Sequence, residues 1–295
     1  MEQSPLQPTP VGALRFNTDT SKLEYYDGNQ WANITSTSPE AHTGGTRGII
    51  AGGNHPGGNS TDIEYITISS TGNAVDFGNF PAGQLAGGMV ASRTRAIYGG
   101  GQWPAAPNND HLSYVTIASK GDMVDFGGDL TANRDFLSAL SDSTRGIFVG
   151  GRDTPAATDV MDYITMASTG VDAEDVGNLT VAVLYYPMTC ASPTRGIVTG
   201  GSPLYSNHID YITIATLGNA KDFGDLTQAR RGLSACASST RGVWAGGMWP
   251  ADHNIIDYVT IASTGDASDF GDLAQTNSGK QRNKAACSNG HGGLG

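Results

Sequence analysis

Charged side chains are scarce in this chain, and the basic ones are scarcer than the acidic ones. They make up 15% of the 295 residues, and the formal net charge is −11 at pH 7. Nucleic acids and anionic membranes are both bound through clustered Lys and Arg, so this composition argues against either partner. An acidic surface is also the ordinary expectation for a secreted or virion protein, so the charge excludes partners without identifying one.

Long hydrophobic runs are missing as well. No stretch of about 20 apolar residues occurs, which excludes a membrane-spanning helix. The first ten residues are polar and contain prolines, without the basic and apolar regions of a secretory signal. We therefore expect neither membrane insertion nor secretion through a signal peptide.

Cysteine is rare, with three residues in the chain. Cys190 and Cys236 each stand four residues before a recurring Thr-Arg-Gly tripeptide, and Cys287 stands at a comparable place near the C-terminus. Val90 and Leu140 occupy the matching positions elsewhere. A position that accepts Cys, Val and Leu is a small apolar packing site, so we predict buried thiols rather than disulfides or metal ligands.

Glycine is abundant, and much of it belongs to a block of 46 to 50 residues that occurs five times. Each block opens with Thr-Arg-Gly or a near match and runs through a short apolar stretch into a glycine pair. The five markers begin at Thr46, Thr94, Thr144, Thr194 and Thr240. A period in this range with several short strands per unit is typical of a radial array of sheets, because no unit buries its faces alone.

Each block is predicted to form four short strands. In the best-defined stretch they are residues 209–215 and 221–226, then 233–238 and 243–247 around a tight turn. Strand 209–215 lacks a clean alternation of apolar and polar residues, which is typical of a sheet covered on both faces. This third strand carries the block tyrosine, and the fourth carries Asp-Phe-Gly or, once, Asp-Val-Gly. The tyrosines are Tyr65, Tyr114, Tyr163, Tyr211 and Tyr258.

This order of elements resembles the kelch repeat of galactose-oxidase-type β-propellers, over a stretch from Thr46 to about Cys287. Kelch units usually carry Trp in the fourth strand, where these blocks carry Phe or Val. The resemblance implies an all-β fold, with a kelch-like β-propeller of about five blades in residues 46–295. Residues 282–288 read as a first strand without a following block, so we expect them to complete the first blade. Six blades is the alternative, if the N-terminal segment contributes strands.

Residues 1–45 fall outside the repeat and are predicted to form an attachment or oligomerisation segment. The stretches 11–17, 22–27 and 28–34 are typical of a small three-stranded β-meander, which is marginally stable without a partner. We expect it to dock on the propeller, on another copy of the chain or on a second protein. The candidate attachment residues are Phe16, Tyr25, Tyr26 and Trp31.

The wording of residues 12–31 resembles a segment that recurs in tail-fibre and other structural proteins of tailed bacteriophages, especially marine and cyanobacterial phages. The repeated Asp-Tyr-Ile-Thr-Ile-Ala and the ending Cys-Ser-Asn-Gly-His-Gly-Gly-Leu resemble the same group. The resemblance implies a virion protein, made in the host cytoplasm, whose partners are other virion proteins and, as a homo-oligomer, itself.

The segments between the glycine pair and the tyrosine strand differ from block to block, and in a propeller they open on one face. Rigid aromatic side chains in such loops suit the binding of a saccharide or a protein. The candidate binding residues are Trp103, Pro104, Tyr205, Trp249 and Pro250. The alternative is that the tryptophans cap their blades or contact a neighbouring subunit.

No pattern for catalysis, cofactor or metal binding stands out. Asp-Phe-Gly recurs at one strand position without the glycine-rich loop or His-Arg-Asp of a kinase, and no glycine pair is followed by the Lys-Ser/Thr of a phosphate loop. His111, His208 and His253 lack metal-ligand spacing. The leading hypothesis is a non-enzymatic tail-fibre or adhesion component that binds a host-surface glycan or protein. The alternatives are a capsid decoration or fibre protein without receptor binding, and a carbohydrate-active propeller enzyme.

Overall fold

The computed structural model describes residues 9–18, 22–34, 47–55, 58–68, 70–103, 109–183, 185–201, 205–216, 218–248, 251 and 253–273. These residues form strands, turns and bends, and no helix occurs among them. The predicted all-β class is therefore confirmed. The chain divides into a small unit, residues 1–42, and a large unit, residues 43–295.

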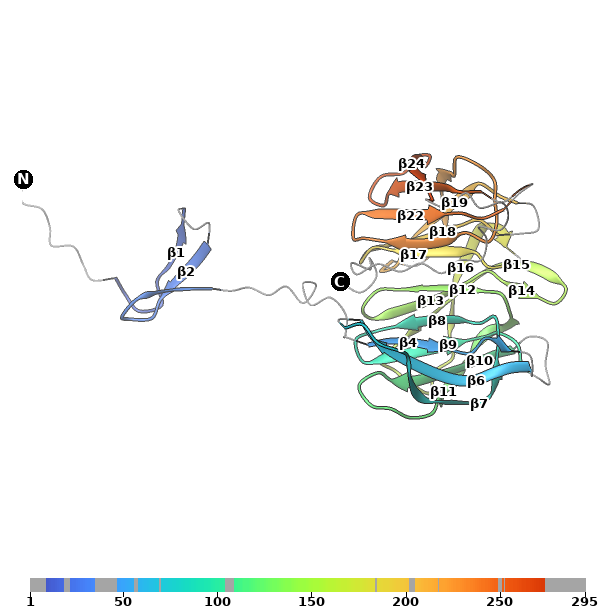
Figure 1. Cartoon of the computed structure of the whole chain (residues 1–295). Coiled ribbons are helices and arrows are strands. Elements are labelled where there is room, and N and C mark those ends of the chain that lie inside the picture. Colours follow the sequence, from blue (N-terminus) through green and yellow to red (C-terminus); the bar gives the residue numbers. More distant parts are fainter. Residues whose placement is uncertain are drawn as a thin grey trace, which may run out of the picture. The chain divides into compact units, whose positions relative to one another are not determined.

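The small unit is the predicted three-stranded meander (Figure 1), in the order β1-β2-β3. Its strands are β1 (Leu14–Asn17), β2 (Lys22–Tyr26) and β3 (Trp31–Asn33). Leu14 pairs with Tyr25 and Phe16 pairs with Leu23, so these four side chains lie on one face of the sheet. All four are exposed, and Phe16 is 62% accessible to solvent. The other described residues of the small unit leave this apolar face uncovered.

The described residues of the large unit form five antiparallel sheets that follow one another along the chain (Figure 1). The first sheet contains β4 (Arg47–Ala51), β5 (Asn54–His55), β6 (Gly58–Thr67) and β7 (Val75–Gln84). The second contains β8 (Gly88–Ala91), β9 (Arg95–Gly99), β10 (Asn109–Thr116) and β11 (Val124–Arg134). The third contains β12 (Ser138–Ser141), β13 (Arg145–Val149), β14 (Arg152–Asp153), β15 (Ala156–Thr165) and β16 (Glu174–Val183).

The fourth sheet contains β17 (Met188–Ala191), β18 (Arg195–Thr199), β19 (His208–Thr213) and β20 (Lys221–Asp225). The fifth contains β21 (Ser234–Ala237), β22 (Arg241–Ala245), β23 (Ile255–Thr260) and β24 (Ser268–Asp272). The second to fifth sheets each run as a meander of four main strands, as predicted. The described part of the first sheet begins at β4, and the expected completing strand, residues 282–288, lies outside the described residues.

The sheets pack on one another in chain order, and each contact between consecutive sheets is called a junction, numbered one to four. The short strands β8, β12, β17 and β21 lie side by side across the second, third and fourth junctions. The Ser141 hydroxyl donates to the Ala91 carbonyl at 3.1 Å, and the Ser138 and Thr189 hydroxyls lie 3.0 Å apart. Each junction holds its own apolar core, so the interior sheets are covered on both faces.

A recurring set of hydrogen bonds joins the fourth strand of one sheet to the turn of the next. At the fourth junction the Gly265 amide donates to the Phe223 carbonyl at 2.7 Å, and the Asp225 amide donates to the Asp266 carboxylate at 3.0 Å. A Cβ atom on Gly224 would lie 2.5 Å from the Gly265 backbone, so this close approach requires glycine. The Asp-Phe-Gly sequence is therefore a packing element.

The marker arginine clamps one sheet to the next. Arg195 Nη1 donates to the Ile261 carbonyl at 2.7 Å, while its guanidinium lies over the ring of Tyr211 in its own sheet at 4.5 Å. The preceding markers make the same two contacts, with carbonyls of the following sheet and the tyrosine of their own: Arg47, Arg95 and Arg145. The repeated Thr-Arg-Gly therefore marks an inter-sheet contact as well as a turn.

The outward faces of the first and fifth sheets lack such a neighbour among the described residues. Phe270 is 53% exposed, whereas its equivalent Phe223 is 3% exposed. On the first sheet Ile68 is 58% exposed, whereas its equivalent Ile261 is 1% exposed. No hydrogen bond joins the fifth sheet to the first within the described ranges. Each end of the array thus presents an apolar face at positions that are buried elsewhere.

The cysteine prediction is confirmed at one position. Cys190 is buried in the core of the fourth junction and forms no disulfide. Burial raises the pKa of its thiol well above the usual range, because a thiolate would be desolvated there. Cys236 is half-buried, and Cys287 lies outside the described residues.

Candidate functional site

The connections between consecutive sheets lie against the residues that follow the glycine pairs. Asp135 and Arg152 form an isolated β-bridge, with Arg152 N donating to Asp135 O at 2.7 Å. Gly150 and Gly151 turn the chain there with φ of 57° and 102°, as expected for the glycine pairs. Matching bridges occur at two other junctions, Leu85 with Gln102 and Arg231 with Met248. The connections and the variable loops therefore lie side by side at the second, third and fifth sheets.

Left-handed backbone recurs in these connections. Its residues are Ala86 (φ 62°), Phe136 (φ 54°), Tyr186 (φ 45°) and Gly232 (φ 64°). Glycine adopts this conformation without steric cost, whereas a bulky side chain costs about 1 kcal/mol or more. Gly232 shows that glycine meets the local requirement. The aromatic residues Phe136 and Tyr186 thus adopt a backbone conformation that disfavours them, which is typical of functional positions.

Three aromatic rings gather at this place and are named here the aromatic cluster: Phe136, Tyr185 and Tyr186. The Phe136 ring contacts both tyrosine rings edge-on, each with centroids 4.9 Å apart. The Tyr186 amide donates to the Phe136 carbonyl at 2.9 Å, so the backbone fixes the pair as well. Tyr186 is exposed, and the other two rings are half-buried. Rings held in this way offer a rigid apolar surface with phenol groups at its edge.

A buried ion pair supports the aromatic cluster. Asp135 is fully buried and accepts from Arg152 through both carboxylate oxygens, with Nε at 2.8 Å, and from Gln102 Nε2 at 2.6 Å. The hydrogen bonds to Asp135 raise the pKa of the Arg152 guanidinium. That guanidinium lies 4.9 Å from the Phe136 ring centroid. The cluster therefore combines rings in edge-on contact with a fixed cation.

The residues that the sequence singled out are placed as follows. Trp103 is half-buried, with its ring 5.6 Å from the imidazole of His111. The guanidinium of Arg231 lies over the ring of half-buried Tyr205 at 5.0 Å. Pro104, Trp249 and Pro250 lie outside the described residues.

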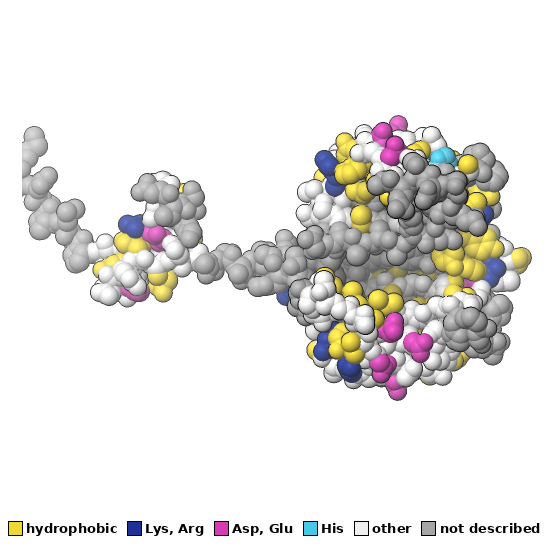
Figure 2. Space-filling model, viewed as in Figure 1, with side chains coloured by type: hydrophobic (Ala, Val, Ile, Leu, Met, Phe, Trp, Pro, Cys, Tyr) yellow, Lys and Arg dark blue, Asp and Glu magenta, His cyan; other side chains and the backbone are white. Residues whose placement is uncertain are grey.

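The predicted attachment residues divide between two faces of the small unit. Phe16 and Tyr25 belong to the exposed apolar face described above. Tyr26 and Trp31 pack together with ring centroids 5.4 Å apart, and Arg15 lies over the indole at 4.3 Å. Figure 2 shows apolar side chains at the surface of the small unit.

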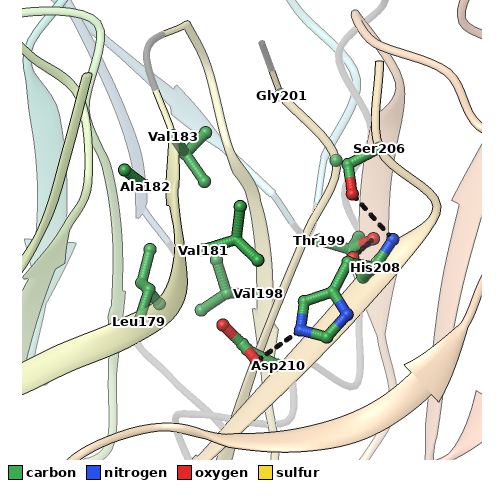
Figure 3. Close-up of a pocket in the computed structure, with 11 residues that line it drawn as sticks. Leu179, Val181, Ala182, Val183, Val198, Thr199, Gly201, Ser206, His208 and Asp210 are labelled. Carbon is green, nitrogen blue, oxygen red and sulfur yellow. Dashed lines mark hydrogen bonds and ion pairs between the residues drawn. The ribbon is translucent and has the colours of Figure 1, made fainter. Parts of the chain in front are cut away.

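A second candidate site is a cavity of about 290 Å³ at the third junction. Its apolar lining comes from β16 and β18, and Figure 3 shows these side chains facing His208 and Asp210 of β19. His208 Nε2 lies 3.0 Å from Asp210 Oδ1, and the His208 amide donates to the Ser206 hydroxyl at 3.0 Å. The cavity thus has an apolar wall opposite a buried carboxylate.

No group of three or more metal-ligating side chains occurs in the described part of the chain. No helix in that part is long and apolar enough to cross a membrane. No model of a known protein family matches the chain, and no curated protein matches its sequence. The kelch-like and phage resemblances therefore rest on the residues quoted above and stay predictions.

Sequence reasoning missed the aromatic cluster because Phe136, Tyr185 and Tyr186 precede the first strand of a block, outside the variable loops. An alignment of the blocks holds the signal: the connections read Leu-Ala, Asp-Phe, Leu-Tyr-Tyr and Arg-Gly in chain order. Phe136 and Tyr186 stand at a position that Ala86 and Gly232 fill in the other connections, and this difference between blocks is the signal.

Proposed function

We propose that the five sheets close into a kelch-like β-propeller that serves, without catalysis, as a recognition component of a tailed-phage particle. Support for closure comes from the two end faces. The turn of the first sheet carries Gly72-Asn73-Ala74, which corresponds to Gly265-Asp266-Ala267 of the fifth. The fifth sheet carries Phe270 and Asp272, which correspond to Phe223 and Asp225. The ends therefore hold the donors and acceptors for one more junction.

Arg241 supports the same arrangement. Its guanidinium lies over Tyr258 at 4.6 Å, as in every other block, but it is exposed and has no carbonyl acceptor among the described residues. In a closed ring its acceptor is the carbonyl of Ile68, which corresponds to the Ile117 carbonyl that Arg47 binds. Residues 282–288 then supply the inner strand of the first sheet.

The aromatic cluster is the observation that carries the recognition role. Phe136 and Tyr186 hold left-handed backbone that glycine would adopt more easily, and the rings of Phe136 and Tyr185 lie beside the guanidinium of Arg152. Fixed aromatic rings with adjacent hydrogen-bonding groups form the kind of surface that binds sugar rings and protein hot spots. We assign a host-surface glycan or protein to this cluster, and assembly to the apolar face of the small unit.

Glycan-array binding with Phe136→Gly and Tyr186→Gly tests the recognition role. Glycine keeps the left-handed backbone, so each variant removes a ring without strain, and binding should fall about 10-fold or more. Ala86→Gly is the matched control, because it changes the equivalent connection without removing a ring. Binding that both ring variants leave unchanged would contradict the assignment to the aromatic cluster, and the absence of any glycan binding by the unmodified protein would favour a decoration protein.

Replacing Leu14 and Phe16 with lysine tests the assembly role. Charges on the exposed face of β1 should abolish incorporation into particles or self-association while leaving the large unit folded. Lysine at Val11, which is exposed but lies outside β1, is the control. Normal incorporation of the double variant would contradict the assignment.

A further inference from the structure

One buried carboxylate position is repeated at three of the four junctions. Asp162, Asp210 and Asp257 each precede the block tyrosine and are buried. Each accepts from the amide and hydroxyl of a threonine on the preceding sheet. The threonines are Thr131, Thr180 and Thr227 in the same order. The three carboxylates therefore share one arrangement, called here the frame: a buried aspartate that accepts hydrogen bonds from a threonine of the preceding sheet.

At two of these junctions an arginine of the preceding sheet fills the space beside the carboxylate. Arg134 Nη2 lies 2.5 Å from Asp162 Oδ2, and its Nη1 donates to the carbonyls of Gly150 and Val160. Arg230 does the same with Asp257 at 2.6 Å and with the carbonyls that correspond to these two. Each arginine stands three residues after the threonine, and both are fully buried. A guanidinium therefore fits this frame twice.

At the third junction the arginine is replaced by Val183, three residues after Thr180. An arginine side chain at this position would extend into the 290 Å³ cavity. Leu179, Val181 and Val183 line the cavity on one side, and Asp210 lines it on the other (Figure 3). Gly200, which corresponds to Gly150, lines the cavity as well. The third junction therefore keeps the aspartate and the threonine of the frame but has no arginine at this position.

His208 does not take the place of the guanidinium on the carboxylate. Its Nε2 contacts Asp210 Oδ1, the oxygen that also accepts from the Thr180 hydroxyl. Asp210 Oδ2, which corresponds to the oxygen that binds Arg134 and Arg230, accepts only from the Thr180 amide among the described residues. One acceptor site therefore faces the cavity at the point where a guanidinium binds elsewhere.

The first junction shows what happens when the carboxylate itself is lost. Ser113 stands at the Asp position, Pro81 stands at the Thr position, and Gln84 stands at the Arg position. Carboxylate, threonine and arginine are thus replaced together there. The third junction is different, because it retains the aspartate and threonine and lacks the arginine alone.

We propose that this cavity binds an alkylguanidinium group, whose planar cation pairs with Asp210 Oδ2 and whose apolar stem packs on Val181 and Val183. The chemistry is that of an arginine side chain, delivered by a partner protein or by a free alkylguanidine. This site is separate from the aromatic cluster, and it does not depend on the proposed recognition role.

The test is a titration of the full-length protein with butylguanidinium, followed by backbone amide shifts in NMR. We expect saturable shifts at residues 179–183 and 208–210, with binding about 10-fold or more tighter than that of neutral butylurea. Equal binding of butylurea, or no saturable shift, would overturn the proposal.

Val183→Arg restores the residue found at the other two junctions and should abolish butylguanidinium binding. Val183→Met fills the path of the apolar stem and should weaken binding in the same direction, which keeps the test decisive if the arginine variant fails to fold. Binding that survives in folded Val183→Arg, or that is undiminished in folded Val183→Met, would contradict the site.

Two further arms sharpen the result. N-acetylarginine amide presents the same side chain on a peptide backbone: binding as tight as that of butylguanidinium assigns the site to an arginine of a partner protein, and failure to bind assigns it to a free alkylguanidine. Arg230→Ala opens the equivalent cavity beside Asp257. It should raise the stoichiometry from about one to about two ligands per chain; a folded variant that still binds one would count against the frame argument.

Discussion

Phe223 and Phe270 occupy the same position of two neighbouring blocks and have opposite surroundings. Phe223 is 3% exposed under the turn of the fifth sheet, whereas Phe270 is 53% exposed at the end of the array. Their local sequences, Asp-Phe-Gly-Asp-Leu, are identical. Burial at this position is therefore decided by the next sheet and not by the residue. The comparison shows that each sheet presents apolar residues which a following sheet buries. The end sheets carry apolar residues at the same positions, although no described sheet covers them.

The largest expected effect comes from truncating the two rings in turn. Phe223→Ala should lower the free energy of unfolding by about 3–5 kcal/mol, because it leaves a cavity in the fourth junction. If the five sheets close into a propeller, Phe270→Ala should lower the free energy of unfolding by a comparable amount in the same denaturant titration. A cost near zero for Phe270→Ala, beside a large cost for Phe223→Ala, would show that the end face stays open.

The marker arginines give the second test. Arg195→Ala removes a charged hydrogen bond to the Ile261 carbonyl and a cation–π contact with Tyr211, so we expect a loss of about 1.5–3 kcal/mol. Arg241→Ala should match it in a closed propeller. Chemical denaturation of both variants decides the point, since an open end would leave Arg241 with its Tyr258 contact alone.

A smaller effect is expected at the turns that join consecutive sheets. Asp266→Ala removes the acceptor of the Asp225 amide and should cost about 1 kcal/mol. Asn73 holds the equivalent position of the first sheet. Asn73→Ala should therefore cost about the same in thermal unfolding if Asp272 is its partner. No change in the unfolding midpoint would remove Asn73 from the closing junction.

Local signals explain why much of the fold was predictable. The strands 209–215, 221–226 and 233–238 correspond to β19, β20 and β21 within two residues at each end, because β-branched runs and glycine turns act over a few positions. The all-β class followed from the same patterns. These signals concern neighbours along the chain.

Contacts between sheets could not be predicted in the same way. Arg195 was interpreted as part of a turn, and its bond to the Ile261 carbonyl joins residues that lie more than 60 positions apart. The cavity beside Asp210 becomes visible only when Val183 is compared with Arg134 and Arg230 in a common frame. A repeat shows its binding sites through the positions at which one copy departs from the others.

Cross-linking across the two ends tests closure of the sheets into a propeller most directly. Cysteines placed at Asn73 and Asp272 are the equivalents of a pair placed at Asp266 and Asp225. At the fourth junction the Asp225 amide nitrogen lies 3.0 Å from the Asp266 carboxylate. A closed ring predicts that a short thiol-reactive linker joins both pairs within one chain, as mass spectrometry of the digested monomer would show. A link within the Asp225–Asp266 pair, with none or only an interchain link for Asn73 and Asp272, would contradict it.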